Sequence, residues 1–429
     1  MIIKRFINNI RHKEKVTKET LWAMCAKGVS ALGGLFVIIF VPKVAGVEVF
    51  GGFSLILAYV LIFGVLAGVP VQEAIKKEVT EGKWDARSKL YFIESIKIKI
   101  ITSFTATIFI FIIVNVCHIY VLRDNFFLFL ILMITRNFWG SIVSNFEASH
   151  RLIYVAVIYI VEWVVKIVAI IICYCFYELT VKALVLSFFM GYISAFVVGA
   201  AIVIKKYGGI SFCNFTSFDS SILKKILPRT FYLALTSLSL ILLARIDVIM
   251  ISYYLSLDYV GFYNIASDIS KQIVFISLPF ILGIVPLFVT DKQPSILFKN
   301  SLRKLCVINI IVCILIFICS EYVILLLYGK QFMEVVTILK ILAIYPLCAV
   351  MQLFIQKTLI LFDKTKQILL FGLCAVALNI ILNALFIPLF NMIGAAIATI
   401  ISYIIWNIIS FIYINKLLCE KTKTMHAMG

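Results

Sequence analysis

The sequence has very little charge for its length. Of its 429 residues only 14% are Asp, Glu, Lys or Arg, whereas 63% are hydrophobic. A soluble protein of this size must cover its surface with polar and charged side chains, so the composition excludes a soluble globular protein. The sequence also lacks the regular alternation of apolar and polar residues that marks an outer-membrane barrel.

Patterns typical of metal sites, disulfide frameworks and enzymes are missing as well. The eleven cysteines form no CxxC pair, with only Cys173 and Cys175 one residue apart, and the four histidines are scattered. The sequence contains no phosphate-binding loop of the GxxxxGK type, and no loop holds paired carboxylates or a Ser/His/Asp set. The basic N-terminus has neither the apolar core nor the cleavage site of a signal peptide. We therefore expect no metal, no cofactor and no enzymatic activity.

Long apolar runs dominate the chain. A helix needs roughly 20 apolar residues to cross the hydrocarbon core, and a backbone inside lipid must satisfy its own hydrogen bonds as a helix. The sequence therefore predicts an all-α integral membrane protein with about twelve transmembrane helices. The predicted spans are 21–41, 49–71, 98–121, 126–143, 153–174, 183–204, 231–254, 261–289, 305–327, 335–361, 368–389 and 393–415.

Basic residues are distributed very unequally between the two sides of these spans. If the N-terminus is inside, 28 Lys and Arg residues lie in the inner segments and four in the outer loops, namely Lys43, Arg123, Lys182 and Lys330. Inner loops of membrane proteins are enriched in basic residues, so both termini are predicted to be cytoplasmic. The same topology accounts for the net charge of +18 without a nucleic-acid partner.

The two halves of the chain resemble each other at a separation of about 210 residues. Residues 49–53 (VFGGF) and 259–263 (YVGFY) open the second and eighth spans, and polar turns at 146–151 and 362–366 follow the fourth and tenth. With six spans per half the repeats point the same way, which predicts two six-helix bundles related by a pseudo-two-fold axis along the membrane normal. We assign the N-terminal bundle to 1–204, a cytoplasmic linker to 205–230 and the C-terminal bundle to 231–429.

The later part of the chain contains several distinctive segments. They are LARIDVIM at 243–250, VGFYNIA at 260–266, LYG at 327–329, Asn379, Asn383, Ile387-Pro388 and GAAIAT at 394–399. These segments are similar to motifs of bacterial polysaccharide flippases of the Wzx O-antigen type, in the multidrug, oligosaccharidyl-lipid and polysaccharide (MOP) exporter superfamily. The similarity extends over essentially the whole chain and is most specific in its later part.

This resemblance implies a function in lipopolysaccharide biosynthesis and polysaccharide transport. The cargo would be one oligosaccharide repeat unit linked to undecaprenyl pyrophosphate, moved from the cytoplasmic to the periplasmic leaflet. The protein would then be a multi-pass protein of the bacterial cytoplasmic (inner) membrane. It would contact membrane lipid and the lipid-linked oligosaccharide, and a polysaccharide polymerase and a chain-length regulator are candidate partners.

Eight ionisable residues lie deep within the predicted spans, five of them cationic and three anionic. A charge at the bilayer centre is costly, so each should face protein or a wet cavity. The excess of cations suits a pyrophosphate cargo, because Arg and Lys can bind phosphate oxygens. The candidate substrate-binding residues are Arg245, Lys27, Arg136, Lys271 and Lys166, and the candidates for ion coupling or charge pairing are Asp247, Asp268 and Glu162.

Local pairing is the alternative role for some of these charges. Glu162 and Lys166 are spaced i,i+4, and Asp268 and Lys271 are spaced i,i+3, so each pair shares a helix face. Arg245 and Asp247 project about 200° apart on a helix and cannot pair with each other. Asn379 and Asn383 could bind sugar hydroxyls, although hydrogen bonding between helices is an equal alternative.

Two other functions remain open from the sequence. A multidrug or small-cation antiporter of the same superfamily is the main alternative, but its cavity should be rich in acids and aromatics. A polysaccharide polymerase or ligase is a weaker alternative, because these proteins generally carry a large outer loop and no outer loop here exceeds about ten residues. The sequence does not identify the sugar, the energy source or the oligomeric state.

Overall fold

Every regular element that the structure assigns is a helix. The computed structural model describes residues 2–68, 70–72, 86–116, 119–206, 219–290 and 293–428, and no strand occurs among them. This is the expected outcome for a chain of long apolar runs, because a helix satisfies its backbone hydrogen bonds within one segment. The predicted all-α class is confirmed.

The chain divides into two compact units. The first contains Met1–Val37 and Tyr59–Ala234, and the second contains Ile38–Ala58 and Leu235–Gly429. The residues around the first helix break, 38–58, thus group with the C-terminal half. The predicted bundle boundaries at 204 and 231 stay a prediction. The linker proposed at 205–230 overlaps two helix ends, and its residues 207–218 lie outside the described part of the chain.

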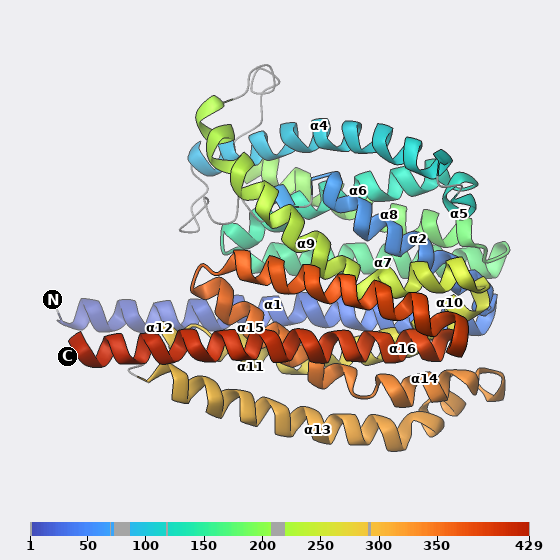
Figure 1. Cartoon of the computed structure of the whole chain (residues 1–429). Coiled ribbons are helices and arrows are strands. Elements are labelled where there is room, and N and C mark those ends of the chain that lie inside the picture. Colours follow the sequence, from blue (N-terminus) through green and yellow to red (C-terminus); the bar gives the residue numbers. More distant parts are fainter. Residues whose placement is uncertain are drawn as a thin grey trace. The chain divides into compact units, whose positions relative to one another are not determined.

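Among the described residues, the first unit consists mainly of long helices. Helices α6, α7 and α8 lie side by side and form the best-packed group of this unit (Figure 1). Its elements are α1 (Ile2–Ala45), the last part of α2 (Val47–Leu66), α4 (Ala86–Val116), α5 (Tyr120–Arg123), α6 (Phe126–Ala148), α7 (Leu152–Phe176), α8 (Val181–Lys206) and the first part of α9 (Ser220–Tyr254), whereas residues 38–45 of α1 and 47–58 of α2 belong to the second unit.

The second unit contains more short elements. Helices α15 and α16 pack against each other, and α13 packs against α14 and α15. Its elements are most of α9 (Ser220–Tyr254), α10 (Leu257–Ile273), η2 (Val274–Ser277), α11 (Leu278–Ile284), α12 (Leu287–Thr290), α13 (Pro294–Leu327), η3 (Lys330–Phe332), α14 (Glu334–Leu342), α15 (Tyr345–Leu361) and α16 (Thr365–Met428).

Ten helices of the described chain are long and apolar enough to span a membrane, compared with twelve predicted spans. One difference is nominal, because α16 covers both predicted spans 368–389 and 393–415 and changes direction at Asn391, where φ is 52°. The other is real. The predicted eighth span, 261–289, is divided into α10, η2, α11 and α12, because Pro279 and Pro286 cannot donate backbone hydrogen bonds to a continuous helix.

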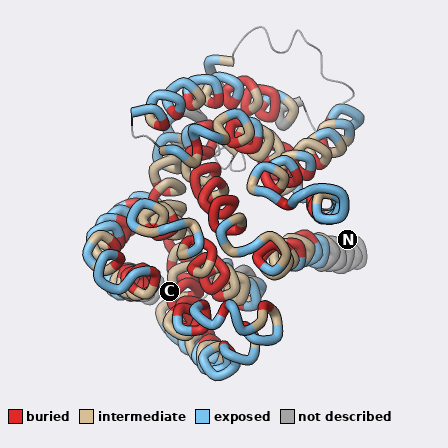
Figure 2. The backbone as a smooth tube through the Cα atoms, turned by 90° about the vertical axis from the view of Figure 1, so that its right-hand side faces the viewer, coloured by how far each residue is buried: buried red, intermediate tan, exposed pale blue. Residues whose placement is uncertain are grey.

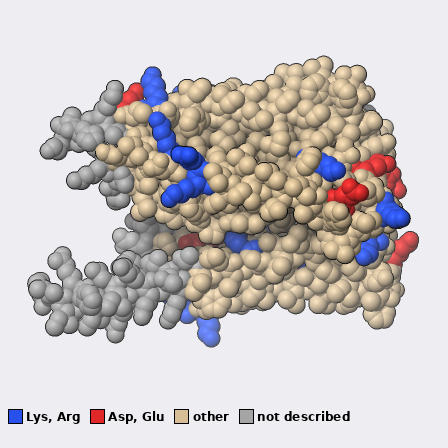
Figure 3. Space-filling model, turned by 90° about the horizontal axis from the view of Figure 1, so that it is seen from below, with Lys and Arg blue, Asp and Glu red and all other residues tan. Residues whose placement is uncertain are grey.

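The surface of the molecule is apolar over broad areas. Long helices carry buried residues on one side and exposed residues on the other (Figure 2), and the exposed residues of α13 include Ile310, Ile314 and Phe317. Most of the face drawn in Figure 3 is uncharged. A soluble protein rarely exposes so much contiguous apolar surface, so these faces are suited to lipid. The chain is a multi-pass membrane protein.

Helix α4 begins well before the predicted third span. The residues between the predicted second and third spans, 72–97, were expected to form an inner loop, but α4 starts at Ala86 and its residues 91–95 are buried. Lys97 and Lys99 are 5% and 0% exposed, so two of the 28 cations assigned to inner segments are buried in a helix. Without these two residues, the predicted inner segments still contain far more Lys and Arg residues than the outer loops. Lys83, in the same predicted loop, lies outside the described residues.

The polar turns expected after the fourth and tenth spans have the same backbone geometry. His150 and Asp363 both adopt the left-handed conformation, with φ of 50° and 54°. In each turn the amide of the following residue donates a hydrogen bond back to the last turn of the helix. Arg151 N donates to Phe146 O at 2.9 Å, and Lys364 N donates to Leu359 O at 2.9 Å. This is the Schellman pattern of a helix C-terminus, and its occurrence in both halves supports the internal repeat.

The glycines that open the second and eighth spans meet each other within the second unit. A Cβ atom on Gly51 would collide with the backbone of Leu257 and Gly261, and a Cβ on Gly261 would collide with the backbone of Val47. Only glycine allows α2 and α10 to approach this closely. The two positions therefore share both a sequence motif and one helix crossing.

Candidate functional site

Arg245, on α9 in the second unit, is loosely held. Its Nη1 donates to Asp268 Oδ1 on α10 over 3.4 Å, and the two side chains are 24% and 19% exposed. No other hydrogen bond of the Arg245 guanidinium occurs among the described residues. An arginine has five N–H donors, so most of this capacity remains free for a ligand.

Lys271, one turn beyond Asp268 on α10, does not pair with it. Its Nζ donates instead to the backbone oxygen of Ala244 on α9 at 3.2 Å. Within the described chain no carboxylate lies at ion-pair distance from Lys271, so the i,i+3 pairing considered from the sequence is not formed. Arg245 and Lys271 thus place two cations between α9 and α10, and the acids Asp268 and Asp247 lie close enough to interact with them electrostatically.

Asp247 lies close enough to Lys271 to interact with it electrostatically, but its carboxyl group bonds within an enclosed cluster. It is 2% exposed, and its Oδ2 accepts hydrogen bonds from the Tyr263 hydroxyl and, at 3.3 Å, from Thr399 Oγ1 on α16. The expectation that Asp247 and Arg245 cannot pair with each other is confirmed, because Arg245 turns to Asp268. In the described part of the chain no cation pairs with Asp247. A carboxyl group buried among neutral hydroxyls needs a proton or a cation to balance its charge.

Asn379 and Asn383 lie in the interior of the second unit on α16. Both are 0% exposed, and Asn383 Nδ2 donates to Asn379 Oδ1 at 3.0 Å. The remaining polar atoms, Asn379 Nδ2 and Asn383 Oδ1, have no hydrogen-bond partner among the described residues. Their enclosure favours the packing alternative over direct contact with sugar hydroxyls.

Glu162 and Lys166 form an internal ion pair on α7 in the first unit. Lys166 Nζ bonds Glu162 Oε1, and the two side chains are 0% and 3% exposed for Lys166 and Glu162. The same ammonium lies 3.8 Å from the ring centre of Tyr192 and 4.4 Å from that of Phe188, both on α8. The i,i+4 pairing considered from the sequence is confirmed. Lys166 is enclosed by its acid and by aromatic faces, an arrangement that favours a structural role.

The other two predicted cations of the first unit are more accessible. Lys27 on α1 is exposed, with its Nζ 5.5 Å from the ring centre of Tyr159 on α7. Arg136 on α6 is half-buried, and no carboxylate of the described chain forms an ion pair with it. Both retain charge that is not neutralised by a described acid.

Sequence reasoning missed a polar group on α4. Lys97 Nζ pairs with Glu94 Oε1 at 2.6 Å, and Lys99 Nζ donates to Asn137 O at 2.8 Å and to Gln72 Oε1 at 3.1 Å. The i,i+3 spacing of Glu94 and Lys97 was the available signal, but these residues were counted as part of a loop. Among the described residues no three His, Cys, Asp or Glu side chains could together hold a metal ion.

Comparisons with known proteins agree with this architecture. A family model described as "Polysaccharide biosynthesis protein" matches residues 16–290. No curated protein matches the chain in sequence.

Solved membrane transporters share the fold at low sequence identity. The lipid II flippase MurJ in an inward closed conformation is 16% identical, with a TM-score of 0.69 over 95% of this chain and 91% of that one. An inward-facing multidrug resistance MATE family transporter of the MOP superfamily is 14% identical, with a TM-score of 0.68 over 92% and 95%. A MOP superfamily transporter from Pyrococcus furiosus is 13% identical, with a TM-score of 0.61 over 96% of both chains. These similarities confirm the predicted fold class.

Proposed function

Because the chain belongs to the polysaccharide biosynthesis protein family, we propose that it is a flippase for a lipid-linked oligosaccharide. The proposed cargo is an O-antigen or other surface polysaccharide repeat unit on undecaprenyl pyrophosphate. The protein would move it from the cytoplasmic to the periplasmic leaflet by alternating access, without catalysing a reaction. The similarity to a structure of a lipid II flippase supports a lipid-linked cargo.

The observation that carries this proposal is the loosely paired Arg245. Its guanidinium has one 3.4 Å bond to Asp268 and is partly exposed, so it can bind a phosphate without first breaking a strong buried ion pair. Lys271 adds a second positive charge whose only described hydrogen bond is to a carbonyl oxygen. Fixed cations lower the cost of desolvating a pyrophosphate, and the planar guanidinium can bind two phosphate oxygens at once.

The pairing and exposure of the predicted cations support a ranking of the proposed substrate contacts. We propose Arg245 and Lys271 as phosphate-binding residues of the second unit, and Lys27 and Arg136 as the accessible cations of the first. Lys166 is the weakest of the five, because Glu162 already neutralises it. For ion coupling we propose Asp247, since its enclosed carboxyl group can gain or lose a balancing proton or sodium ion.

The multidrug or small-cation antiporter remains the second candidate, because a MATE transporter has the same fold. We rank it second because the matched family is described by polysaccharide biosynthesis. The polar group between α9 and α10 contains Arg245 and Lys271 together with Asp268 and Asp247, so its formal charge is balanced, and the loosely paired guanidinium of Arg245 is the feature that suits an anionic cargo. A polymerase or ligase would require reactive groups that the sequence does not place in an outer loop.

Localisation and partners follow from the proposed cargo. We propose that the protein resides in the bacterial cytoplasmic membrane with both termini in the cytoplasm. The basic residues at the ends of its spans support this orientation. A polysaccharide polymerase and a chain-length regulator are its proposed protein partners, because they would act on the same repeat unit.

Reconstitution into liposomes tests the function. Purified protein should transfer a polyprenyl-pyrophosphate oligosaccharide between leaflets, measured as the fraction of glycolipid that an added glycosidase can cleave. Liposomes with heat-inactivated protein are the control. Exchange of a lipophilic cation such as ethidium for protons or sodium, without transfer of glycolipid, would instead establish the antiporter.

A further inference from the structure

A pocket of about 690 Å³ lies at one end of the second unit, away from Arg245. It is formed by the turn between α15 and α16 and by the C-terminal part of α16. Its lining residues are Leu361, Phe362, Asp363, Lys364, Tyr413, Lys416, Leu417 and Glu420. The volume lies within the range of about 300–1,000 Å³ that small-molecule sites occupy.

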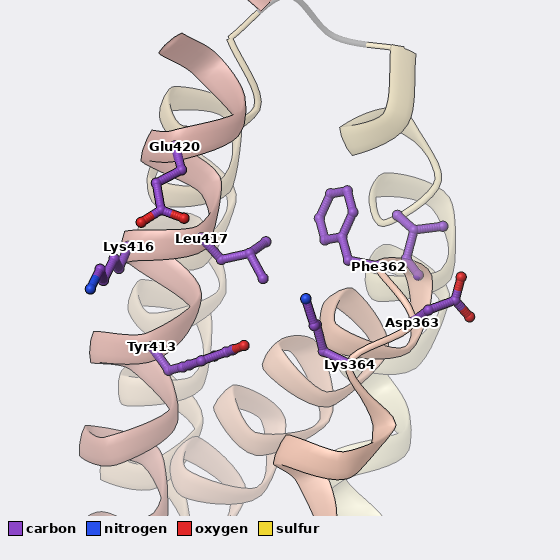
Figure 4. A pocket seen from close by; sticks show the side chains of 8 residues that line it. Phe362, Asp363, Lys364, Tyr413, Lys416, Leu417 and Glu420 are labelled. Carbon is purple, nitrogen blue, oxygen red and sulfur yellow. The ribbon is translucent and has the colours of Figure 1, made fainter. Parts of the chain in front are cut away.

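Some side chains of this pocket point into it and others point away. The Lys364 amine and the Tyr413 hydroxyl extend toward each other across the space between the turn and α16, and Phe362 and Leu417 border the same space (Figure 4). Asp363 points away from this space, and Lys416 points outward (Figure 4). The pocket therefore presents one cation and one hydroxyl donor beside an apolar wall.

Both polar groups are positioned and free to bind. The left-handed conformation of Asp363 reverses the chain and directs Lys364 back over α16, and the ring of Phe371 packs at 5.6 Å against that of Tyr413. Neither the Lys364 ammonium nor the Tyr413 hydroxyl has a hydrogen-bond partner among the described side chains. An unbonded ammonium and phenol on opposite walls can each donate to a different oxygen of one phosphate.

The pocket lies where two candidate membrane spans meet. Leu361 ends one candidate span and Thr365 begins the next. A ligand there would hold its polar part at the level of the turn while an apolar chain follows Phe362 and Leu417 toward the bilayer. Basic pockets between span ends are suited to anionic lipid headgroups.

We propose that this pocket binds the phosphodiester headgroup of an anionic phospholipid. The charges of its lining select a single negative charge, because the two lysines are offset by Asp363 and Glu420 and only Lys364 points inward. A pyrophosphate would bring further negative charge, and the described lining residues offer no second inward cation to balance it. The pocket is thus a lipid site distinct from the proposed cargo contacts at Arg245 and Lys271.

Lipid titration of the full-length protein tests the site. In native mass spectrometry, phosphatidylglycerol should form a first adduct at lower concentration than phosphatidylcholine with the same acyl chains. Lys364→Gln should weaken this adduct about tenfold or more, because it removes a charged hydrogen bond, and Tyr413→Phe should weaken it roughly two- to tenfold. Lys366→Gln, at an exposed position in the first turn of α16 outside the pocket, is the matched control and should leave the adduct unchanged.

Each alternative result overturns the proposal. Equal weakening by Lys364→Gln and Lys366→Gln would reveal a diffuse charge effect, and equal retention of both lipids would exclude headgroup selection. Displacement of phosphatidylglycerol by undecaprenyl pyrophosphate in a Lys364-dependent manner would assign the pocket to the carrier lipid. The readout is lipid binding, so failure here leaves glycolipid transfer in liposomes unaffected, and the two proposals can fail separately.

Discussion

Replacement of Arg245 by alanine separates binding of the cargo from stability of the fold. The ion pair of Arg245 with Asp268 is long, at 3.4 Å, and both side chains are partly exposed. Pairs of this kind contribute about 0–1 kcal/mol to folding. We therefore expect Arg245→Ala to change the free energy of unfolding by less than about 1 kcal/mol and to leave the amount of protein in the membrane near normal.

The expected effect on the cargo is larger. A hydrogen bond to a charged group contributes about 1.5–3 kcal/mol, and each 1.4 kcal/mol corresponds to about tenfold in affinity. Arg245→Ala should therefore weaken binding of the pyrophosphate about 10- to 100-fold and abolish complementation of a flippase-deficient strain. Arg245→Lys should restore part of the activity because it keeps the charge without the planar fork, whereas Arg245→Gln should not.

Transfer in liposomes, complementation and membrane abundance are measured on the same set of variants. If Arg245 serves only to neutralise Asp268, the alanine variant should be depleted from the membrane. Adding Asp268→Asn should then restore both abundance and transfer, because the acid would no longer lack a partner. Such a rescue would refute phosphate binding by Arg245.

Three further predictions concern stability and topology. Lys166→Met should lower the abundance of the protein in the membrane, because it leaves Glu162 buried without a partner at a cost of about 3–5 kcal/mol. Adding Glu162→Gln should restore the abundance. Unchanged abundance of Lys166→Met alone would contradict a structural role for the pair. Gly261→Ala should lower the thermal unfolding temperature, because the added methyl group overpacks the crossing of α2 and α10. Gly283→Ala is the control and should not lower it, because Gly283 has open space around it. Equal shifts in the two variants would contradict the close approach of the helices. In a cysteine-free background, an impermeant thiol reagent added outside should label single cysteines at Asp258 and Asn391, which are predicted to lie outside. It should not label cysteines at Lys83 and Lys364, which are predicted to lie inside, and the reverse labelling pattern would invert the topology.

The helical fold could be predicted because membrane helices depend on local composition. Most predicted spans coincide with helices, and the paired turns at His150 and Asp363 lie where the polar residues interrupt the apolar runs. The prediction of the eighth span as a single helix was wrong. It followed the high hydropathy of the segment and gave too little weight to Pro279 and Pro286, which interrupt a helix. The start of α4 was missed for the opposite reason: Lys97 and Lys99 suggested a loop, and only tertiary contacts reveal that they are buried.

The site could be predicted in part. The i,i+4 spacing of Glu162 and Lys166 was sufficient to predict their pairing, because both partners lie on one helix. The same reasoning failed for Asp268 and Lys271, since α9 offers Asp268 a guanidinium and offers Lys271 a carbonyl oxygen. Such partners on another helix cannot be read from spacing.

The predicted cations differ in how completely other side chains pair with them. This difference supports the proposal that the loosely paired ones bind a transient ligand. Lys166 pairs with Glu162 and has aromatic rings around it, so a phosphate would have to displace a complete set of interactions. Arg245 has one long bond and unused donors, so a phosphate would add interactions and remove little. A flippase must release its cargo as well as bind it, and weakly held, partly exposed cations can exchange one anionic partner for another at small cost. Asp268 would then be the group that re-pairs with Arg245 after the pyrophosphate leaves.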